Sequence, residues 1–87
     1  MYTLRRLTDD VWEYGSMSAA ISDSDTLEHD ARPRVGVRLR VGSLHGRSFA
    51  ERDWWQTSRI TKIVRDEPQQ VEFWTEDGSY YLWRIDR

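Results

Sequence analysis

Few side chains in this chain could do chemistry, and its two histidines are the first to consider. A catalytic nucleophile needs a neighbouring base, and His29 and His45 are the only histidines. His45 lies in the glycine-containing segment 42–47, where we expect an exposed loop. His29 stands between Glu28 and Asp30, a spacing that does not turn all three side chains toward one metal ion. Since cysteine and a glycine-rich phosphate loop are also absent, we expect no enzyme activity, no metal and no cofactor.

Arginine offers a second kind of chemistry. Residues 31–50 contain no acidic side chain, and the guanidinium groups there could follow a phosphate backbone while nearby tryptophans stack on bases. This nucleic-acid alternative uses Arg34, Arg38, Arg40, Arg47, Trp54 and Trp55. The sequence pI of about 5.6 is far from the basic value expected of such a binder. Two other interpretations stay open for Arg38 and Arg40: pairing within the chain, with a strand face that carries Glu72, Trp74 and Glu76, or contact with a protein partner.

A third candidate site is aromatic. Trp74, Tyr81 and Trp83 occur in two alternating segments near the C-terminus, and a strand face that carries them is too apolar for plain contact with solvent. One interpretation is that the chain covers this face itself, through Trp12 and Tyr14 of the N-terminal strands. The other is that the face binds a partner, including a second copy of the chain, because Trp and Tyr dominate protein interfaces.

The elements that position these residues are strands. Residues 34–42 alternate between apolar and polar side chains, which is typical of a half-buried strand. Residues 54–64 predict a strand with an irregularity near Thr57 and Ser58, and residues 71–76 and 79–85 predict two more. Residues 2–7 and 11–14 are weaker candidates. Four or five strands with short turns favour a small antiparallel barrel or sandwich of about the size of an SH3 domain.

The last two strands should form a hairpin. Asp77-Gly78 between alternating segments is typical of a two-residue type I′ turn, whose two residues both need positive φ. Such a turn pairs Trp74 with Tyr81 and Phe73 with Leu82, together with Thr75 with Tyr80 and Glu72 with Trp83. In this register Phe73, Tyr80 and Leu82 share the core face, and Trp74, Tyr81, Trp83 and Ile85 share the other.

Charge is segregated along the chain although the net charge is only −2. Residues 7–31 contain seven carboxylates and no Lys or Arg, whereas residues 32–65 contain nine basic side chains against Glu51 and Asp53. We expect residues 15–32 to form a long acidic loop, because large apolar side chains are almost absent from its acidic part. The acidic run 22–30 has another interpretation, as an acidic lure for a basic partner or as a DNA-like charge decoy.

Length and composition limit the class of protein. A chain of 87 residues has room for one domain, residues 1–87, and without cysteine it cannot be stapled by disulfides. Five Trp, four Tyr and two Phe supply a core instead. No apolar run reaches the roughly 18 residues of a membrane span, and no apolar stretch follows the basic N-terminus as in a secretory signal. We therefore expect a cytoplasmic protein without membrane contact.

Residues 53–63, 71–75 and 78–83 carry a Thr-Ser-x-Ile, Phe-x-Thr and Gly-Ser-x-Tyr pattern. This pattern resembles one found in small phage and mobile-element proteins with a C-terminal β-hairpin. The resemblance implies a phage-encoded accessory protein that binds and blocks a host or defence macromolecule. It carries over no site residue, and Trp74 and Tyr81 depart from it because the pattern has smaller or polar residues there.

Taken together, these patterns predict a non-catalytic binding protein that inhibits or redirects a host or defence protein. Its contact residues would be Trp74, Tyr81 and Trp83, or Arg38 and Arg40. The first alternative is the nucleic-acid module described above. The second is a homo-oligomeric structural subunit in which the aromatic hairpin face closes a homodimer.

Overall fold

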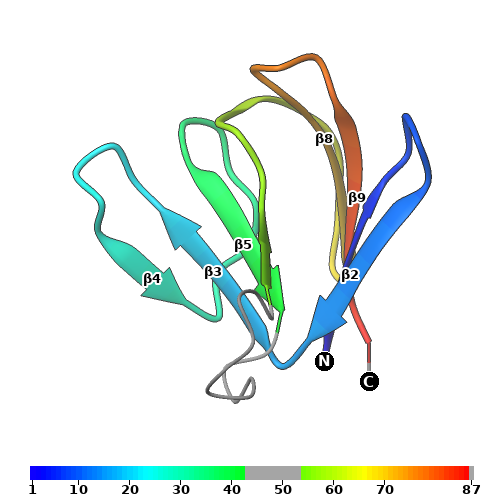
Figure 1. Cartoon of the computed structure of the whole chain (residues 1–87), viewed down its shortest axis with the longest axis horizontal. Coiled ribbons are helices and arrows are strands. Elements are labelled where there is room, and N and C mark those ends of the chain that lie inside the picture. Colours follow the sequence, from blue (N-terminus) through cyan, green and yellow to red (C-terminus); the bar gives the residue numbers. More distant parts are fainter. Residues whose placement is uncertain (43–53, 87) are drawn as a thin grey trace.

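The computed structural model describes residues 1–42 and 54–86, which form nine strands in two antiparallel sheets (Figure 1). The five-stranded sheet has the order β2-β1-β9-β8-β7 and the four-stranded sheet the order β4-β3-β5-β6. The strands are β1 (Tyr2–Arg6), β2 (Val11–Gly15), β3 (Met17–Ile21), β4 (Leu27–His29), β5 (Arg38–Gly42), β6 (Trp54–Gln56), β7 (Ile60–Glu67), β8 (Gln70–Thr75) and β9 (Tyr80–Ile85). The prediction of a small antiparallel β sandwich or barrel is confirmed.

The two sheets share one core, to which both contribute side chains. Phe73, Tyr81 and Trp83 from the five-stranded sheet are at most 2% exposed, and Leu39 and Val41 from β5 are fully buried. The Phe73 and Tyr81 rings stack with their centroids 5.3 Å apart. Large aromatic side chains therefore supply much of the buried area in this small chain, as its composition predicts.

The C-terminal hairpin exists as predicted, but its register differs by one residue. Trp74 pairs with Tyr80 and Phe73 with Tyr81, rather than Trp74 with Tyr81 and Phe73 with Leu82. The cause is a three-residue loop, Glu76 to Gly78, between Thr75 and Ser79. The Thr75 N–H donates to the Ser79 carbonyl (3.0 Å), and Gly78 alone in this loop has positive φ (83°), as expected of a type I turn followed by a left-handed residue.

The one-residue difference moves whole sets of side chains to the opposite face of the sheet. Tyr81 and Trp83 join Phe73 in the core, whereas Tyr80 and Leu82 join Trp74 on the outer face. The prediction that Tyr80 and Leu82 face the core is therefore wrong. The alternative that the chain covers Tyr81 and Trp83 is confirmed, although the cover is the four-stranded sheet.

Gly78→Ala is expected to lower the free energy of unfolding by about 1 kcal/mol, because a residue with a Cβ is disfavoured at positive φ. A Cβ at this position would meet nothing within 4 Å, so backbone conformation alone should set the cost. Gly78→Asn should lose less, since Asn tolerates this region. Urea unfolding of both variants measures the difference. Equal stability of Gly78→Ala and the wild type would contradict the loop geometry.

Residues 15–32 are not one long loop, so that prediction is wrong. Residues 17–21 form β3, whose five residues are all buried, and residues 27–29 form the short strand β4. β3 pairs with β5, placing Ala20 opposite Leu39 and Ser18 opposite Val41. Small side chains carry little hydrophobic signal, yet they let other parts of the chain cover both faces of this strand.

The expected strand 34–42 begins only at Arg38. Gly36 has φ of 96° and its N–H donates to the Ile60 carbonyl (2.9 Å), so the chain turns there, and Val35 is 59% exposed. The predicted irregularity near Thr57 and Ser58 is confirmed. It separates β6 from β7 and carries the chain from one sheet to the other, with the Thr57 N–H donating to the Leu39 carbonyl (2.8 Å).

Candidate functional site

The structure separates the three aromatic residues expected to form a contact surface. Tyr81 and Trp83 are 2% and 1% exposed, while Trp74 is 40% exposed. The Trp83 Nε1–H donates to the Ser18 Oγ (2.9 Å), and Trp83 stacks on Tyr2. The expectation that Tyr81 and Trp83 bind a partner is therefore wrong, because both are core residues. Of the three aromatic residues, Trp74 remains as a candidate contact residue.

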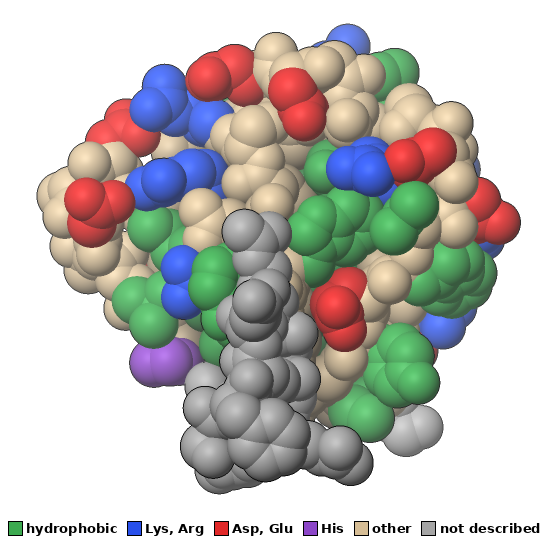
Figure 2. Space-filling model, viewed as in Figure 1, with side chains coloured by type: hydrophobic (Ala, Val, Ile, Leu, Met, Phe, Trp, Pro, Cys, Tyr) green, Lys and Arg blue, Asp and Glu red, His purple; other side chains and the backbone are tan. Residues whose placement is uncertain are grey.

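A different set of exposed aromatic residues lies on the outer face of the five-stranded sheet. Trp12 of β2 is 49% exposed and Tyr14 65% exposed, so these two residues do not cover the hairpin as expected. We call the outer-face residues Trp12, Tyr14, Trp74 and Tyr80 the aromatic face. Figure 2 shows hydrophobic side chains gathered over the side of the molecule formed by β2, β8 and β9, interrupted by a few charged groups.

The strand register places the residues of this face. Trp12 lies opposite Arg5, Arg5 opposite Leu82, and Leu82 opposite Glu72, so these four form one row across β2, β1, β9 and β8. Directly opposite residues in antiparallel strands share a face. β2 and β8 are three strand spacings apart, about 14 Å. The aromatic groups thus flank a short row of mixed side chains.

Contacts within the sheet hold the aromatic side chains in place. The Arg5 guanidinium lies 4.6 Å from the centre of the Trp12 ring, and its Nε–H donates to Asp10 (2.6 Å). The Trp74 and Tyr80 ring centroids are 4.7 Å apart. Tyr80 donates its hydroxyl hydrogen to Glu72 (2.9 Å). Burial of the side chain raises the pKa of Tyr80 most, and this hydrogen bond raises it further. Ordered aromatic side chains lose little conformational freedom when a partner binds.

Most charged groups among these aromatic residues have partners of opposite sign, whereas Lys62, which lies opposite Trp74, forms no ion pair with a described residue. Arg5 pairs with Asp10, and Glu72 pairs with Arg65 (3.4 Å). Because of these pairs, the aromatic face carries little net charge. Such a face suits contact with an apolar surface better than contact with a phosphate backbone.

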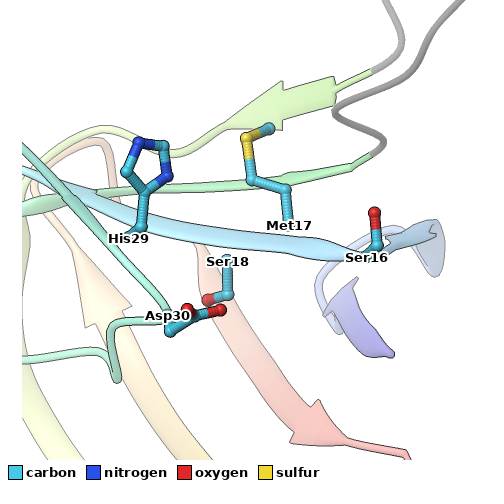
Figure 3. Close-up of a pocket in the computed structure, with 5 residues that line it drawn as sticks. All are labelled: Ser16, Met17, Ser18, His29 and Asp30. Atoms are coloured by element: carbon cyan, nitrogen blue, oxygen red, sulfur yellow. The ribbon is translucent and has the colours of Figure 1, made fainter.

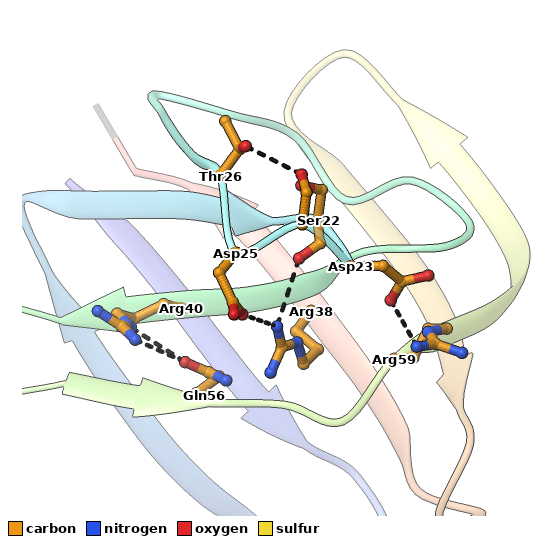
Figure 4. Close-up of polar contacts among 9 residues, drawn as sticks. Ser22, Asp23, Asp25, Thr26, Arg38, Arg40, Gln56 and Arg59 are labelled. Atoms are coloured by element: carbon orange, nitrogen blue, oxygen red, sulfur yellow. Dashed lines mark hydrogen bonds and ion pairs between the residues drawn. The ribbon is translucent and has the colours of Figure 1, made fainter.

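The arginines of the second candidate site are paired within the chain. Figure 4 shows that Arg38 donates to Asp25 (3.0 Å) and that Arg59 forms an ion pair with Asp23. Arg34 forms a further ion pair with Glu28 (2.8 Å). Arg38 and Arg40 thus have contacts within the chain, and their binding of a protein or nucleic-acid partner stays a prediction. The predicted partners Glu72, Trp74 and Glu76 are wrong, because β8 belongs to the other sheet. The acidic segment 23–28 and the basic segments thus neutralise each other at the surface.

The two tryptophans proposed for base stacking are engaged elsewhere. Trp55 packs against the core, where it meets Tyr81 edge-on (5.8 Å) and lies beneath the Arg6 guanidinium (4.7 Å). The Trp54 ring is covered by the Arg40 guanidinium at 3.9 Å. Arg47, also part of that alternative, lies outside the described residues.

His29 borders a shallow pocket of about 290 Å³, which Ser16, Met17, Ser18 and Asp30 also line. The polar side chains that line this pocket do not point toward one common position. Figure 3 shows His29 and Met17 on one side of β3 and Ser18 and Asp30 on the other. Ser18 already donates to the Ala31 carbonyl and accepts from Trp83. Within residues 1–42 and 54–86, no three His, Asp or Glu side chains are grouped as a metal site would need.

None of the comparisons, with protein-family models, curated protein sequences and solved structures, returned a match. The described part of the chain also contains no helix that could cross a membrane.

Sequence reasoning missed the aromatic face because it placed Trp12 and Tyr14 over the hairpin. The signal was present: Trp12 and Tyr14 are two residues apart and share the side of β2 that carries no partner sheet. The correct hairpin register was needed to see that Trp74 and Tyr80 lie on the same side.

Proposed function

We propose that this chain is a non-catalytic binding protein whose aromatic face contacts an apolar patch on a partner protein. The observation that carries the proposal is the exposure of Trp12, Tyr14 and Trp74 on one sheet face, at 49%, 65% and 40%. Exposed Trp and Tyr side chains, held by neighbours such as Arg5, are typical of interface hot spots.

Charge favours a protein partner over nucleic acid. A nucleic-acid surface needs several unpaired cations along a track, whereas Arg5 and Arg65 on this face each have a carboxylate partner and only Lys62, opposite Trp74, forms no ion pair with a described residue. Binding should therefore change little between low and physiological ionic strength, apart from a modest effect on the rate of association.

The resemblance to small phage and mobile-element proteins supports a more specific form of the proposal. In this form the chain is phage-encoded, acts in the host cytoplasm, and inhibits or redirects a host or defence protein. Blocking requires only a stable contact surface, which suits a protein for which we propose no catalytic role.

Trp74→Ala is expected to weaken partner binding about tenfold, or about 1.4 kcal/mol, because truncation of an interface Trp removes a central contact. The test is a pull-down from nuclease-treated host lysate, followed by titration calorimetry with the retained protein. Leu27→Ala is the matched control, since Leu27 is 39% exposed but belongs to the other sheet. Equal retention of the same protein by the Trp74→Ala and Leu27→Ala variants would argue against the aromatic face.

A second copy of the chain is the competing occupant of this face. Light scattering of the purified protein distinguishes a second copy of the chain from a different partner protein, because we expect the chain to be a monomer at micromolar concentration. A dimer that Trp74→Ala converts to a monomer would assign the face to self-association and overturn the proposed partner.

A further inference from the structure

Lys62 lies on β7, at the border of the aromatic face. It is the only lysine of the chain, since twelve of the thirteen Lys and Arg side chains are arginines. Its Cα lies opposite that of Trp74, and Trp74 lies opposite Tyr80, so the three residues form one row across β7, β8 and β9. Directly opposite residues share a face, with their Cβ atoms about 5 Å apart. Lys62 is exposed and Trp74 is 40% exposed, so a partner that touches the Trp74 ring also meets the Lys62 side chain.

The ammonium group of Lys62 forms no ion pair with a described residue, although Glu72 lies diagonally across from it on the same face. Arg65, the next basic residue on β7, pairs with both Glu67 (3.5 Å) and Glu72 (3.4 Å). Glu72 also accepts the hydroxyl hydrogen of Tyr80 (2.9 Å), so it already serves two other groups. Lys62 thus leaves a positive charge at this border of the aromatic face that no described carboxylate pairs with.

A partner that covers Trp74 would remove water from Lys62 as well. Loss of this hydration disfavours a charged group unless an opposite charge replaces it. A purely apolar patch would leave the ammonium group without a partner, whereas a carboxylate beside the patch would pair with it. Because lysine carries a compact charge on a flexible stem, such a pair does not require one fixed geometry. Ion pairs of this kind add specificity to an interface more than affinity.

We propose that the partner of the aromatic face carries an Asp or Glu side chain at the edge of its apolar patch, and that Lys62 binds this carboxylate. The proposal rests on the protein-binding function proposed above and adds the chemistry that the partner surface must have. An apolar surface without the acid would meet an unpaired ammonium group and bind more weakly. The competing explanation is protection of the sheet edge, because β7 is an edge strand and lysines on such strands discourage pairing with another chain.

Because the chain contains one lysine, its contact can be captured by amine chemistry. The protein is mixed with the partner retained from nuclease-treated host lysate, and a carbodiimide is added. The carbodiimide activates a carboxylate and leaves as a urea when the Lys62 amine forms an amide bond in its place. We expect mass spectrometry to find Lys62 joined to an Asp or Glu side chain of the partner. Lys62→Arg keeps the charge without the amine, so it should bind within about twofold of the wild type and lose this crosslink.

Titration calorimetry with the same partner measures what the charge contributes. Lys62→Gln is expected to weaken binding about threefold, the effect of one exposed ion pair, and Lys62→Glu about tenfold, because two carboxylates then face each other. Arg34→Gln is the matched control, since it also replaces an exposed cation with an amide, but this cation pairs with Glu28 of the other sheet. Replacing the crosslinked acid of the partner with lysine should restore the binding of Lys62→Glu to within about threefold of the wild type.

If Trp74→Ala weakens binding and Lys62→Glu does not, the aromatic face stands as the contact surface and the role of Lys62 is overturned. If neither variant changes binding, the protein-binding proposal fails as well. A Lys62→Gln variant that self-associates in light scattering but binds the partner as the wild type does would assign Lys62 to protection of the sheet edge instead. A wild-type crosslink formed only by the N-terminal amine, or only between two copies of the chain, would also overturn the proposed contact.

Discussion

Trp83→Ala is expected to lower the free energy of unfolding by about 3–5 kcal/mol, the usual cost of removing a buried Trp side chain. Trp83 is 1% exposed and touches three parts of the chain: it stacks on Tyr2 (5.8 Å), donates to Ser18 (2.9 Å), and lies beneath Arg32 (5.4 Å). Its loss would leave a cavity between the sheets and would deprive the buried Ser18 oxygen of its donor. Small domains have about 5–15 kcal/mol of stability in all, so this variant should be close to unfolding.

Urea unfolding followed by far-UV circular dichroism measures the change. Trp74→Ala is the matched control: the same side chain is removed, but from a position that is 40% exposed, and the loss should be below about 1 kcal/mol. Similar losses for the two variants would contradict the hairpin register, since the register decides which Trp is inside.

Arg32→Ala has the second largest expected effect on stability, about 1–2 kcal/mol. The Arg32 guanidinium donates to Asp66 (2.7 Å) and to the carbonyls of Glu67 (2.7 Å) and Pro68 (2.9 Å), and it stacks over Trp83. Hydrogen bonds from charged groups are worth about 1.5–3 kcal/mol when buried, and the 40% exposure of this side chain reduces that figure. Arg32 thereby ties the segment before β5 to the β7–β8 turn.

Arg32→Lys separates charge from geometry. Lysine keeps the charge but cannot present the fork that reaches three oxygens, so we expect it to recover less than half of the loss. The measurement is again the urea midpoint. A lysine variant as stable as the wild type would show that only the charge of Arg32 matters. It would contradict the stabilising role that we assign to the three hydrogen bonds of the guanidinium group.

The sequence predicted most strands but could not settle which face each strand turns inward. Asp77-Gly78 fits both a two-residue type I′ turn and the last two positions of the three-residue loop observed, and these loops differ by one residue of register. That one residue decides whether Tyr81 is a surface residue or a core residue. Local turn chemistry does not contain the answer, because the packing of the opposite sheet selects the register.

The strand β3 escaped prediction for a different reason. Ser18, Ala19 and Ala20 are small and give no clear periodicity, yet all three are at most 1% exposed. Ala20 packs in the core, Ser18 lies against Trp83, and Ala19 lies between His29 and Arg40 of the neighbouring strands. These contacts join segments distant in sequence, so no local pattern shows them.

The segregated charges have a structural meaning that the sequence showed only in part. The acidic segment folds back on the basic one, so that Asp23, Asp25 and Glu28 meet Arg59, Arg38 and Arg34. Figure 2 shows acidic and basic side chains next to each other on the side of the molecule where β3, β4 and β5 lie. Each exposed pair contributes little stability, but together they leave little net charge on that surface.

The most direct test of the proposed protein contact is photo-crosslinking from the aromatic face in living host cells. A photoreactive phenylalanine analogue replaces Tyr14, which is 65% exposed on this face, and in a second protein it replaces Val35, which is 59% exposed elsewhere. We expect one host protein to be crosslinked from position 14 and not from position 35. Crosslinks to the same protein from both positions, or from position 35 alone, would contradict the claim that the aromatic face is the binding surface.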